Sequence, residues 1–311
     1  MRAALAVAAL AAVLAASPGT ASVAEKPERQ RPQGPAADHF ADDVPRLLDS
    51  EWEWPIGGFG GMRRGAPLQH VPVVFVHGNN VDAGDWYPVR DAFRAAGWTD
   101  QELWALSYNG LGGSNGRALF TPNPQADEER RRMGKDAVTY VTENEVNVPD
   151  LARFLDVVRD YTGSDRFMLV GHSLGVTLAR ETLRQRPDLR QDLVAFVGVA
   201  GGNAGTSFCP PGSEGRVVSC DEIAAGTPWL ERLNREVPAQ APGRWMTVYD
   251  GSGVADPAFL ATYAQSPRLP GADNRQFPGT YHNDLRLDPA IVAVYRAFLE
   301  DASGAALDER T

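Results

Sequence analysis

The feature that most constrains this chain is a serine set between two glycines, where a strand pattern changes into a helix pattern. Residues 171–175 read Gly-His-Ser-Leu-Gly. A β-prone apolar run at 166–170 precedes them, and apolar residues at helical spacing follow at 174–183. A sharp strand-to-helix turn of this kind holds its serine in a strained conformation with the hydroxyl exposed. The pattern therefore predicts Ser173 as a nucleophile.

The residues around this serine also restrict the backbone. Glycines are expected on both sides of it, because the turn brings two stretches of backbone so close that a β-carbon would clash. Val176 departs from the pattern, since a small residue usually occupies this position. The sequence therefore leaves open how closely the following helix packs. A chance match in a loop is the alternative, and the strand before and the helix after disfavour it.

Strand and helix signals alternate along the rest of the chain. Apolar strand-type runs occupy residues 72–77, 103–108, 166–170, 193–199 and 245–249. Helical patterns are expected at 86–96, 148–161, 174–183, 229–233 and from 289 to 299. Asn147 can cap the second of these helices, and Asp288 with Pro289 can start the last. This alternation predicts an α/β fold with a mostly parallel central sheet and helices on both faces.

Two long excursions interrupt the alternation, at residues 109–145 and 201–243. Each follows the carboxyl end of an expected strand, where a doubly wound sheet places its ligand. We therefore expect them to wall the site, with Leu119, Phe120 and Trp229 as substrate contacts. Packing in the core is the alternative for these three side chains.

The beginning of the chain resembles an export signal. Met1 and Arg2 precede an Ala/Leu/Val-rich run, and residues 22–24 read Ser-Val-Ala. This pattern predicts a signal peptide over 1–24 that is removed on secretion, with a retained anchor as the alternative. No other stretch is long and apolar enough to cross a bilayer.

Composition divides the remainder into two parts. Residues 25–65 are rich in proline, glycine and charge and are expected to form a partly disordered tail. Trp52 and Trp54 suggest that its end docks on the body of the protein. The expected catalytic domain then covers residues 66–305.

The two cysteines, Cys209 and Cys220, predict one disulfide in an exported protein. They provide no metal site, because no histidine pair accompanies them. The net charge of −10 argues against nucleic acid and anionic membranes as partners, since both would be repelled. Composition gives no information on the oligomeric state.

A serine hydroxyl needs a base, and in this class of turn the base follows late in the chain. His282 is the only histidine after Ser173. An acid must orient this imidazole, and Asp250, Asp256 and Asp273 are the candidates after the last core strand. Asp256 is favoured because a short loop of small residues carries it beyond the strand end. Asp250 is the runner-up, with a turn-forming role as its alternative.

Two backbone N–H groups should stabilise a developing oxyanion. Leu174 supplies one, because it directly follows the nucleophile at a helix start. Asn79 is chosen for the other, in the His-Gly-Asn-Asn loop after the first core strand. A simple glycine–asparagine turn is the alternative for that loop. His77 in the same loop is expected to be structural.

At this point the chain resembles a known family. Residues 75–79 (Phe-Val-His-Gly-Asn), 171–175 and 279–282 (Gly-Thr-Tyr-His) are similar to motifs of the α/β-hydrolases that include secreted bacterial class 2 lipases. Residues 199–203 (Val-Ala-Gly-Gly-Asn) and 252–256 (Ser-Gly-Val-Ala-Asp) add to this likeness. The Val-His-Gly-Asn opening is also similar to some extracellular poly(3-hydroxybutyrate) depolymerases.

The resemblance covers roughly residues 70–300 and implies ester hydrolysis without a cofactor. It supports Asp256 as the acid. The two excursions are departures, so a preference for acyl chain length cannot be carried over. The expectation is a secreted carboxylic ester hydrolase, a lipase or esterase, whose activity falls as His282 becomes protonated in acid.

Three alternatives remain open at this point. A polyester depolymerase would use the same mechanism on a solid substrate. The fold could also support amide hydrolysis or acyl transfer, because fold alone does not settle function. A non-catalytic binding protein that has kept the fold is the third alternative, which a complete Ser, Asp and His set disfavours.

Overall fold

A central sheet of eight strands organises the part of the chain that the computed structural model describes, namely residues 38–48, 56–79, 81–108, 147–213, 220–240 and 242–308. The strands are β1 (Asp38–Phe40), β2 (Gly58–Gly60), β3 (Val73–Val76), β4 (Leu103–Leu106), β5 (Phe167–His172), β6 (Leu193–Val199), β7 (Arg244–Tyr249) and β8 (Asp273–Gln276). Their order is β1-β2-β4-β3-β5-β6-β7-β8. Neighbours from β4 to β8 are parallel, whereas β2 is antiparallel to β4 and β1 is parallel to β2. The expected mostly parallel sheet of an α/β-hydrolase is confirmed.

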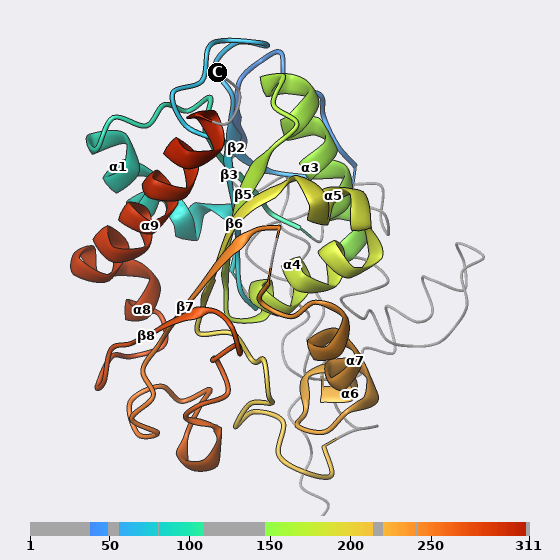
Figure 1. Cartoon of the computed structure of the whole chain (residues 1–311), viewed down its shortest axis with the longest axis vertical. Coiled ribbons are helices and arrows are strands. Elements are labelled where there is room, and N and C mark those ends of the chain that lie inside the picture. Colours follow the sequence, from blue (N-terminus) through green and yellow to red (C-terminus); the bar gives the residue numbers. More distant parts are fainter. Residues whose placement is uncertain are drawn as a thin grey trace, which may run out of the picture. The chain divides into compact units, whose positions relative to one another are not determined.

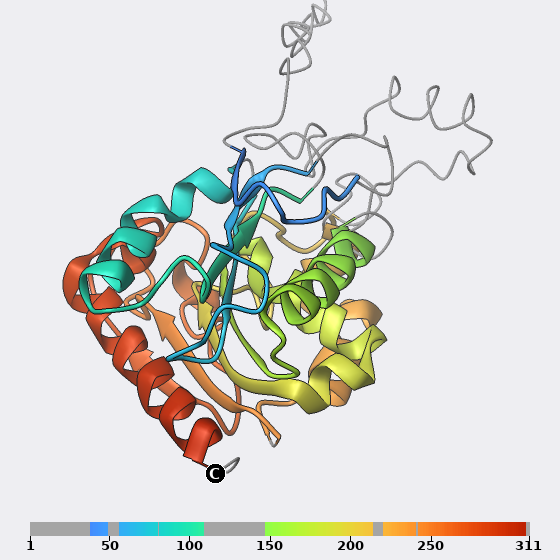
Figure 2. The ribbon, with the colours of Figure 1, turned by 90° about the horizontal axis from the view of Figure 1, so that it is seen from above.

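Helices cover both faces of this sheet (Figures 1 and 2). One face carries η1 (Ala83–Trp86), α1 (Tyr87–Ala95), α8 (Asp284–Leu287) and α9 (Pro289–Asp308). The other face carries α3 (Val148–Thr162), α4 (Leu174–Gln185) and α5 (Pro187–Asp192). Two short helices, α6 (Cys220–Ile223) and α7 (Pro228–Glu236), lie beyond the strand ends next to α4. The single turn η3 (Ala261–Tyr263) lies in the long connection between β7 and β8.

The two-residue period of the strands divides the core into two layers. In β3, Val74 and Val76 pack with α3 and α4, whereas Val73 and Phe75 pack with α1 and α9. All four side chains are fully buried, as expected of a parallel strand covered on both faces. The residues that follow β3 and β5 therefore emerge together at the carboxyl edge of the sheet.

Val176, the departure from the usual turn pattern, is accommodated by two glycines of the neighbouring strand and loop. A β-carbon built on Gly201 would lie 2.5 Å from the Val176 side chain, and one on Gly198 would lie 3.2 Å from it. The valine is fully buried in the space that these glycines leave. Helix α4 therefore packs closely against the sheet in spite of its larger side chain.

Some elements differ from the sequence-based expectations. The sheet begins before residue 66, because β1 and β2 lie within the stretch that was expected to be a tail. Strand β8 was not predicted, and α9 extends to Asp308 and not only to Leu299.

Of the two helix caps predicted from the sequence, the one on α3 is absent and the one on α9 is present. Asn147 does not cap α3, because its backbone is already helical (φ −84°, ψ −35°) and its side chain makes no cap hydrogen bond. Asp288 does cap α9, since its Oδ1 accepts hydrogen bonds from the backbone N–H groups of Ala290 at 2.8 Å and Ile291 at 3.4 Å.

The expected signal peptide at 1–24, the residues Trp52 and Trp54, and the excursion at 109–145 lie outside the described residues. The predicted disulfide between Cys209 and Cys220 is present, with Cα atoms 5.3 Å apart, and both cysteines are fully buried. No helix within the described ranges has both the length and the apolar character that crossing a membrane requires.

Candidate active site

Ser173 occupies the turn between β5 and α4 with φ of 54° and ψ of −122°. A positive φ is strained for any residue with a β-carbon. The backbone N–H of Ser173 donates a hydrogen bond of 2.8 Å to the carbonyl of Val199, which fixes the turn on strand β6. A β-carbon on Gly175 would collide with the carbonyl oxygens of Val76 and His77. The sharp turn that the sequence pattern predicts is therefore present, for the steric reason given above.

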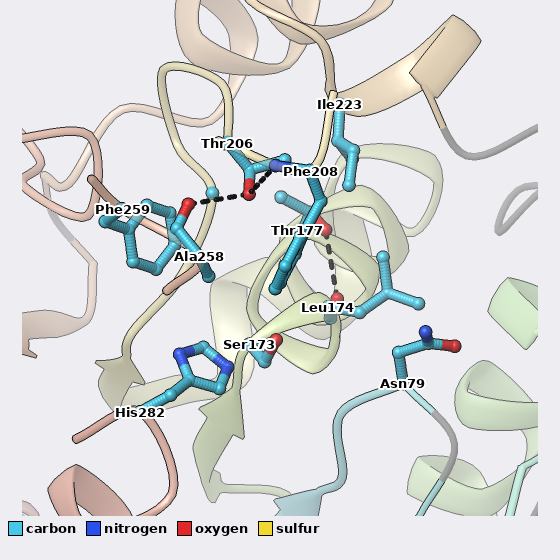
Figure 3. A pocket seen from close by; sticks show the side chains of 11 residues that line it. Asn79, Ser173, Leu174, Thr177, Thr206, Phe208, Ile223, Ala258, Phe259 and His282 are labelled. Atoms are coloured by element: carbon cyan, nitrogen blue, oxygen red, sulfur yellow. Dashed lines mark hydrogen bonds between the residues drawn. The ribbon is translucent and has the colours of Figure 1, made fainter. Parts of the chain in front are cut away.

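His282 lies beside Ser173 on the wall of one pocket (Figure 3). Its Nδ1 is 2.9 Å from both carboxylate oxygens of Asp256. Because a carboxylate only accepts hydrogen bonds, Nδ1 carries the proton and Nε2 is left with its lone pair. Asp256 is fully buried, and its Oδ1 also accepts a hydrogen bond of 2.8 Å from the backbone N–H of Ala258. The arrangement fixes both the orientation and the tautomer of the imidazole.

The other two candidate acids are engaged elsewhere. Asp250 accepts hydrogen bonds from the backbone N–H groups of Gly279 at 2.6 Å and Ser252 at 3.0 Å. Burial alone would raise the pKa of Asp250, but hydrogen bonds from Ser252 and Gly279 outweigh it and the pKa is lowered. Asp273 begins β8 and forms an ion pair with Arg275. Asp250 therefore braces the loop that carries His282, and Asp256 contacts the imidazole itself.

The two expected oxyanion residues, Asn79 and Leu174, both line the pocket that Ser173 and His282 share. The loop that carries Asn79 is held from behind by Tyr108. The Tyr108 hydroxyl donates a hydrogen bond of 2.6 Å to the carbonyl of His77, and the two rings stack with centroids 3.7 Å apart. A β-carbon on Gly78 would come within 3.0 Å of the Ser173 side chain. Glycine at this position lets the loop approach Ser173 closely.

His77 is fully buried, and burial lowers its pKa to about 3. It therefore stays neutral over the physiological range. This agrees with the expectation that His77 has a structural role.

The pocket has a volume of about 490 Å³. Most of the side chains that surround it are apolar or carry a single hydroxyl, which suits an uncharged substrate. Its lining residues are Asn79, Ser173, Leu174, Thr177, Gly202, Thr206, Phe208, Ile223, Ala258, Phe259 and His282.

Of the three expected substrate contacts, Trp229 is the one that lies within the described residues. Trp229 does not line this pocket, because it packs into the core from α7 and is only 8% exposed. Leu119 and Phe120 lie outside the described residues. Phe208 and Ile223 take the place that was expected for Trp229, and they flank the disulfide in sequence. The presence of the cysteine pair was a signal that could have pointed to them.

The disulfide connects two segments of the pocket wall. Phe208 directly precedes Cys209, and Ile223 lies in the short helix that starts at Cys220. The same wall is bonded to the segment after Asp256, since the Thr206 hydroxyl donates a hydrogen bond of 2.8 Å to the carbonyl of Ala258 (Figure 3). The wall and the loop that carries Asp256 therefore form one connected unit.

In the ranges that the structure describes, no three His, Cys, Asp or Glu side chains gather in a way that could hold a metal ion.

Comparison with known proteins gives one family and many similar folds. A family model described as lipase (class 2) matches residues 70–240. The mature form of Bacillus licheniformis lipase BlEst2 is 14% identical and superposes with a TM-score of 0.53 over 77% of this chain and 99% of that chain.

 A carboxylesterase structure from the ammonia-oxidizing thaumarchaeon Nitrososphaera gargenis is 12% identical, with a TM-score of 0.50 over 84% of this chain and 100% of that chain.

Lipase B of Aspergillus fumigatus is 13% identical, with a TM-score of 0.50 over 85% of this chain and 62% of that chain. At these identities the structural likeness shows the fold alone. No curated protein matches the chain. The family model covers the strand, turn and helix around Ser173 and the loop of Asn79, and it ends before Asp256 and His282.

Proposed function

Because this chain belongs to the class 2 lipase family and is a carboxylic ester hydrolase with the α/β-hydrolase fold, we propose that it is a secreted lipase or esterase acting through a Ser173–His282–Asp256 triad. The observation that carries the proposal is the hydrogen bond of 2.9 Å between buried Asp256 and His282 Nδ1, in the pocket that also contains Ser173. A base held in this way beside a strained serine is the arrangement that activates a hydroxyl.

The reaction follows from these positions. The Ser173 Oγ attacks the ester carbonyl while His282 Nε2 takes its proton, and the N–H groups of Asn79 and Leu174 stabilise the oxyanion. The protonated imidazole then gives this proton to the leaving alcohol, so that an acyl group remains on Ser173. A water molecule, deprotonated by His282, attacks the acyl-enzyme and releases the acid. Asp256 stabilises the imidazolium in both steps.

The pocket and its surroundings support an apolar ester as substrate. Phe208, Ile223 and Phe259 give the pocket an apolar wall. Phe208 and Leu260, the residue after the lining residue Phe259, are also exposed, and the backbone N–H of Leu260 donates a hydrogen bond of 2.7 Å to the hydroxyl of Ser207. Exposed apolar side chains at one place on a surface mark an interaction site. We therefore favour a lipid ester.

Secretion is supported by two independent features. Residues 1–24 have the composition of a signal peptide, and the disulfide is typical of proteins that mature in an oxidising compartment. Detection of the mature chain in culture medium, with an amino terminus at Glu25, would test this part of the proposal. A chain that keeps residue 1 and stays with the cells would contradict it.

The catalytic proposal is tested by hydrolysis of p-nitrophenyl esters of increasing acyl length, with wild type and Ser173→Ala. We expect wild type to turn over these esters and Ser173→Ala to lose at least about 10³-fold in kcat, because the nucleophile is gone. A fluorophosphonate probe should label wild type alone. Unchanged activity of Ser173→Ala would overturn the proposal. Faster release from polyester granules than from lipid emulsions would identify a polyester depolymerase instead.

A further inference from the structure

The proposed base sits on an exposed loop. From residue 277 to residue 283, between β8 and α8, no residue is buried. Phe277 packs against the core at the start of this loop, and beyond it the loop depends on polar contacts. Asp250 holds it at Gly279, through the hydrogen bond of 2.6 Å described above. A second polar contact reaches the loop at His282 itself.

This second contact comes from His172, the residue before the nucleophile. Its side chain points into the protein and the residue is only 3% exposed. The Nε2 atom lies 3.2 Å from the backbone carbonyl oxygen of His282, and the two rings have centroids 4.8 Å apart. A carbonyl oxygen only accepts hydrogen bonds, so Nε2 of His172 carries the proton.

The His172 ring keeps its Nε2–H donor, and stays neutral, around neutral pH. Burial, followed by the charges of His282, Arg286 and His77, lowers the pKa of His172 well below 6.5. The ring is therefore neutral, with one N–H group. Its Nδ1 has no hydrogen-bond partner among the described residues, and a β-carbon on Gly78 would come within 3.2 Å of it. The ring is confined between the loop of Asn79 and the loop of His282.

We propose that His172 is a positioning residue, whose Nε2–H group fixes the backbone of His282 and so places the proposed base against Ser173. The inference rests on the proposed function, because it needs His282 to act as the base. It explains why a polar residue occupies a fully enclosed position next to the nucleophile, where an apolar residue could fill the same space. An error of about 1 Å in the position of a catalytic group can cost about 100-fold in rate.

Two substitutions separate the hydrogen bond from the volume of the ring. His172→Leu removes the donor and keeps an apolar side chain, whereas His172→Gln keeps an N–H donor at a similar reach. We expect His172→Leu to lower kcat by about 10- to 100-fold with KM within about twofold, and His172→Gln to keep kcat within about fivefold of wild type. His70→Gln is the matched control, because His70 also stacks on a ring, that of Trp98, but at the opposite edge of the sheet.

A merely structural role would give a different set of results. It would lower the melting temperature of His172→Leu but leave the kcat and the fluorophosphonate labelling rate of the folded fraction unchanged. A positioning role predicts slower labelling of folded His172→Leu, because the probe also needs an activated Ser173. It further predicts that the proton NMR signal of the His282 Nδ1–H group broadens in His172→Leu and stays sharp in His172→Gln.

Wild-type kcat and labelling rate in folded His172→Leu would overturn the inference, as would equal losses in the Leu and Gln variants. If His172→Leu does not fold, the decision rests on His172→Gln, whose NMR signal and kcat must both stay near those of wild type. Ser173→Ala is measured in parallel. If it keeps activity, the proposed function fails; if it is inactive while His172→Leu is normal, only the role of His172 fails.

Discussion

Asp250 and Asp256 lie on the same short loop, yet their carboxylates point to different partners. Asp250 accepts hydrogen bonds from the backbone N–H groups of Ser252 and Gly279, whereas Asp256 accepts one from the Nδ1–H group of His282. One aspartate therefore shapes the loop and the other contacts the imidazole. The same difference should appear in the kinetics of their asparagine variants.

We predict that Asp256→Asn lowers kcat by about 10³- to 10⁴-fold, because an amide favours the wrong tautomer of the imidazole. Asp250→Asn keeps one oxygen as an acceptor and should cost less than about tenfold. Hydrolysis of p-nitrophenyl butyrate by both folded variants measures the two effects. A larger loss for Asp250→Asn than for Asp256→Asn would assign the acid to Asp250.

At the scale of single residues, the sequence was informative wherever a pattern carried its own mechanism. Ser173 was predicted from the turn, and His282 was predicted because it is the only later histidine. The choice among three aspartates depended on the path of a loop, which local patterns do not specify. Trp229 was misplaced because an aromatic side chain on a short helix suits a core as well as a pocket.

Helix α4 and the loop after strand β6 fit together through a valine and a glycine. Val176 occupies the space that a side chain at position 201 would need. The large residue at position 176 is visible in the sequence, but its partner Gly201 is not, because the two positions lie on different elements. The pair thus explains a local departure by a contact distant in sequence.

We predict that Gly201→Ala destabilises the protein by about 1–3 kcal/mol, because its β-carbon overlaps the Val176 side chain. Val176→Ala alone should also destabilise, because it leaves a cavity. The loss of unfolding free energy in the double variant should be smaller than the sum of the two single losses by about 1 kcal/mol or more. Urea unfolding of the four proteins measures this coupling. Strict additivity would show that the two residues do not compete for space.

Strands with a clear apolar pattern were predicted from the sequence, and strands without one were missed. The five core strands from β3 to β7 were found because each is a buried apolar run. Strand β8 was missed because its residues, Asp-Asn-Arg-Gln, are polar and partly exposed at the edge of the sheet. Strands β1 and β2 have three residues each, too few to show a period. Their pairing depends on the rest of the sheet.

Over the whole molecule, two buried histidines connect stability to pH. Burial lowers the pKa of His77 to about 3 and that of His172 well below 6.5, so both are neutral in the folded protein. In the unfolded chain each takes up a proton near pH 6.5. The unfolded state therefore binds more protons below this pH, and stability falls as the pH falls.

We predict that the free energy of unfolding decreases by about 2 kcal/mol from pH 7 to pH 5 on account of His77 alone, with a further decrease from His172. Urea unfolding at several pH values measures the slope. His77→Asn removes one titrating group and should make the slope shallower. A slope unchanged by this substitution would show that His77 is not responsible.

The positive φ of Ser173 has a consequence for how such a chain evolves. Glycine would relax that backbone, so exchanging the proposed nucleophile for glycine should make the protein more stable while abolishing turnover. Under the proposed mechanism, selection for catalysis is what keeps serine at this position. In a lineage that no longer needed the reaction, glycine would be expected to replace Ser173 and give a more stable, inactive protein.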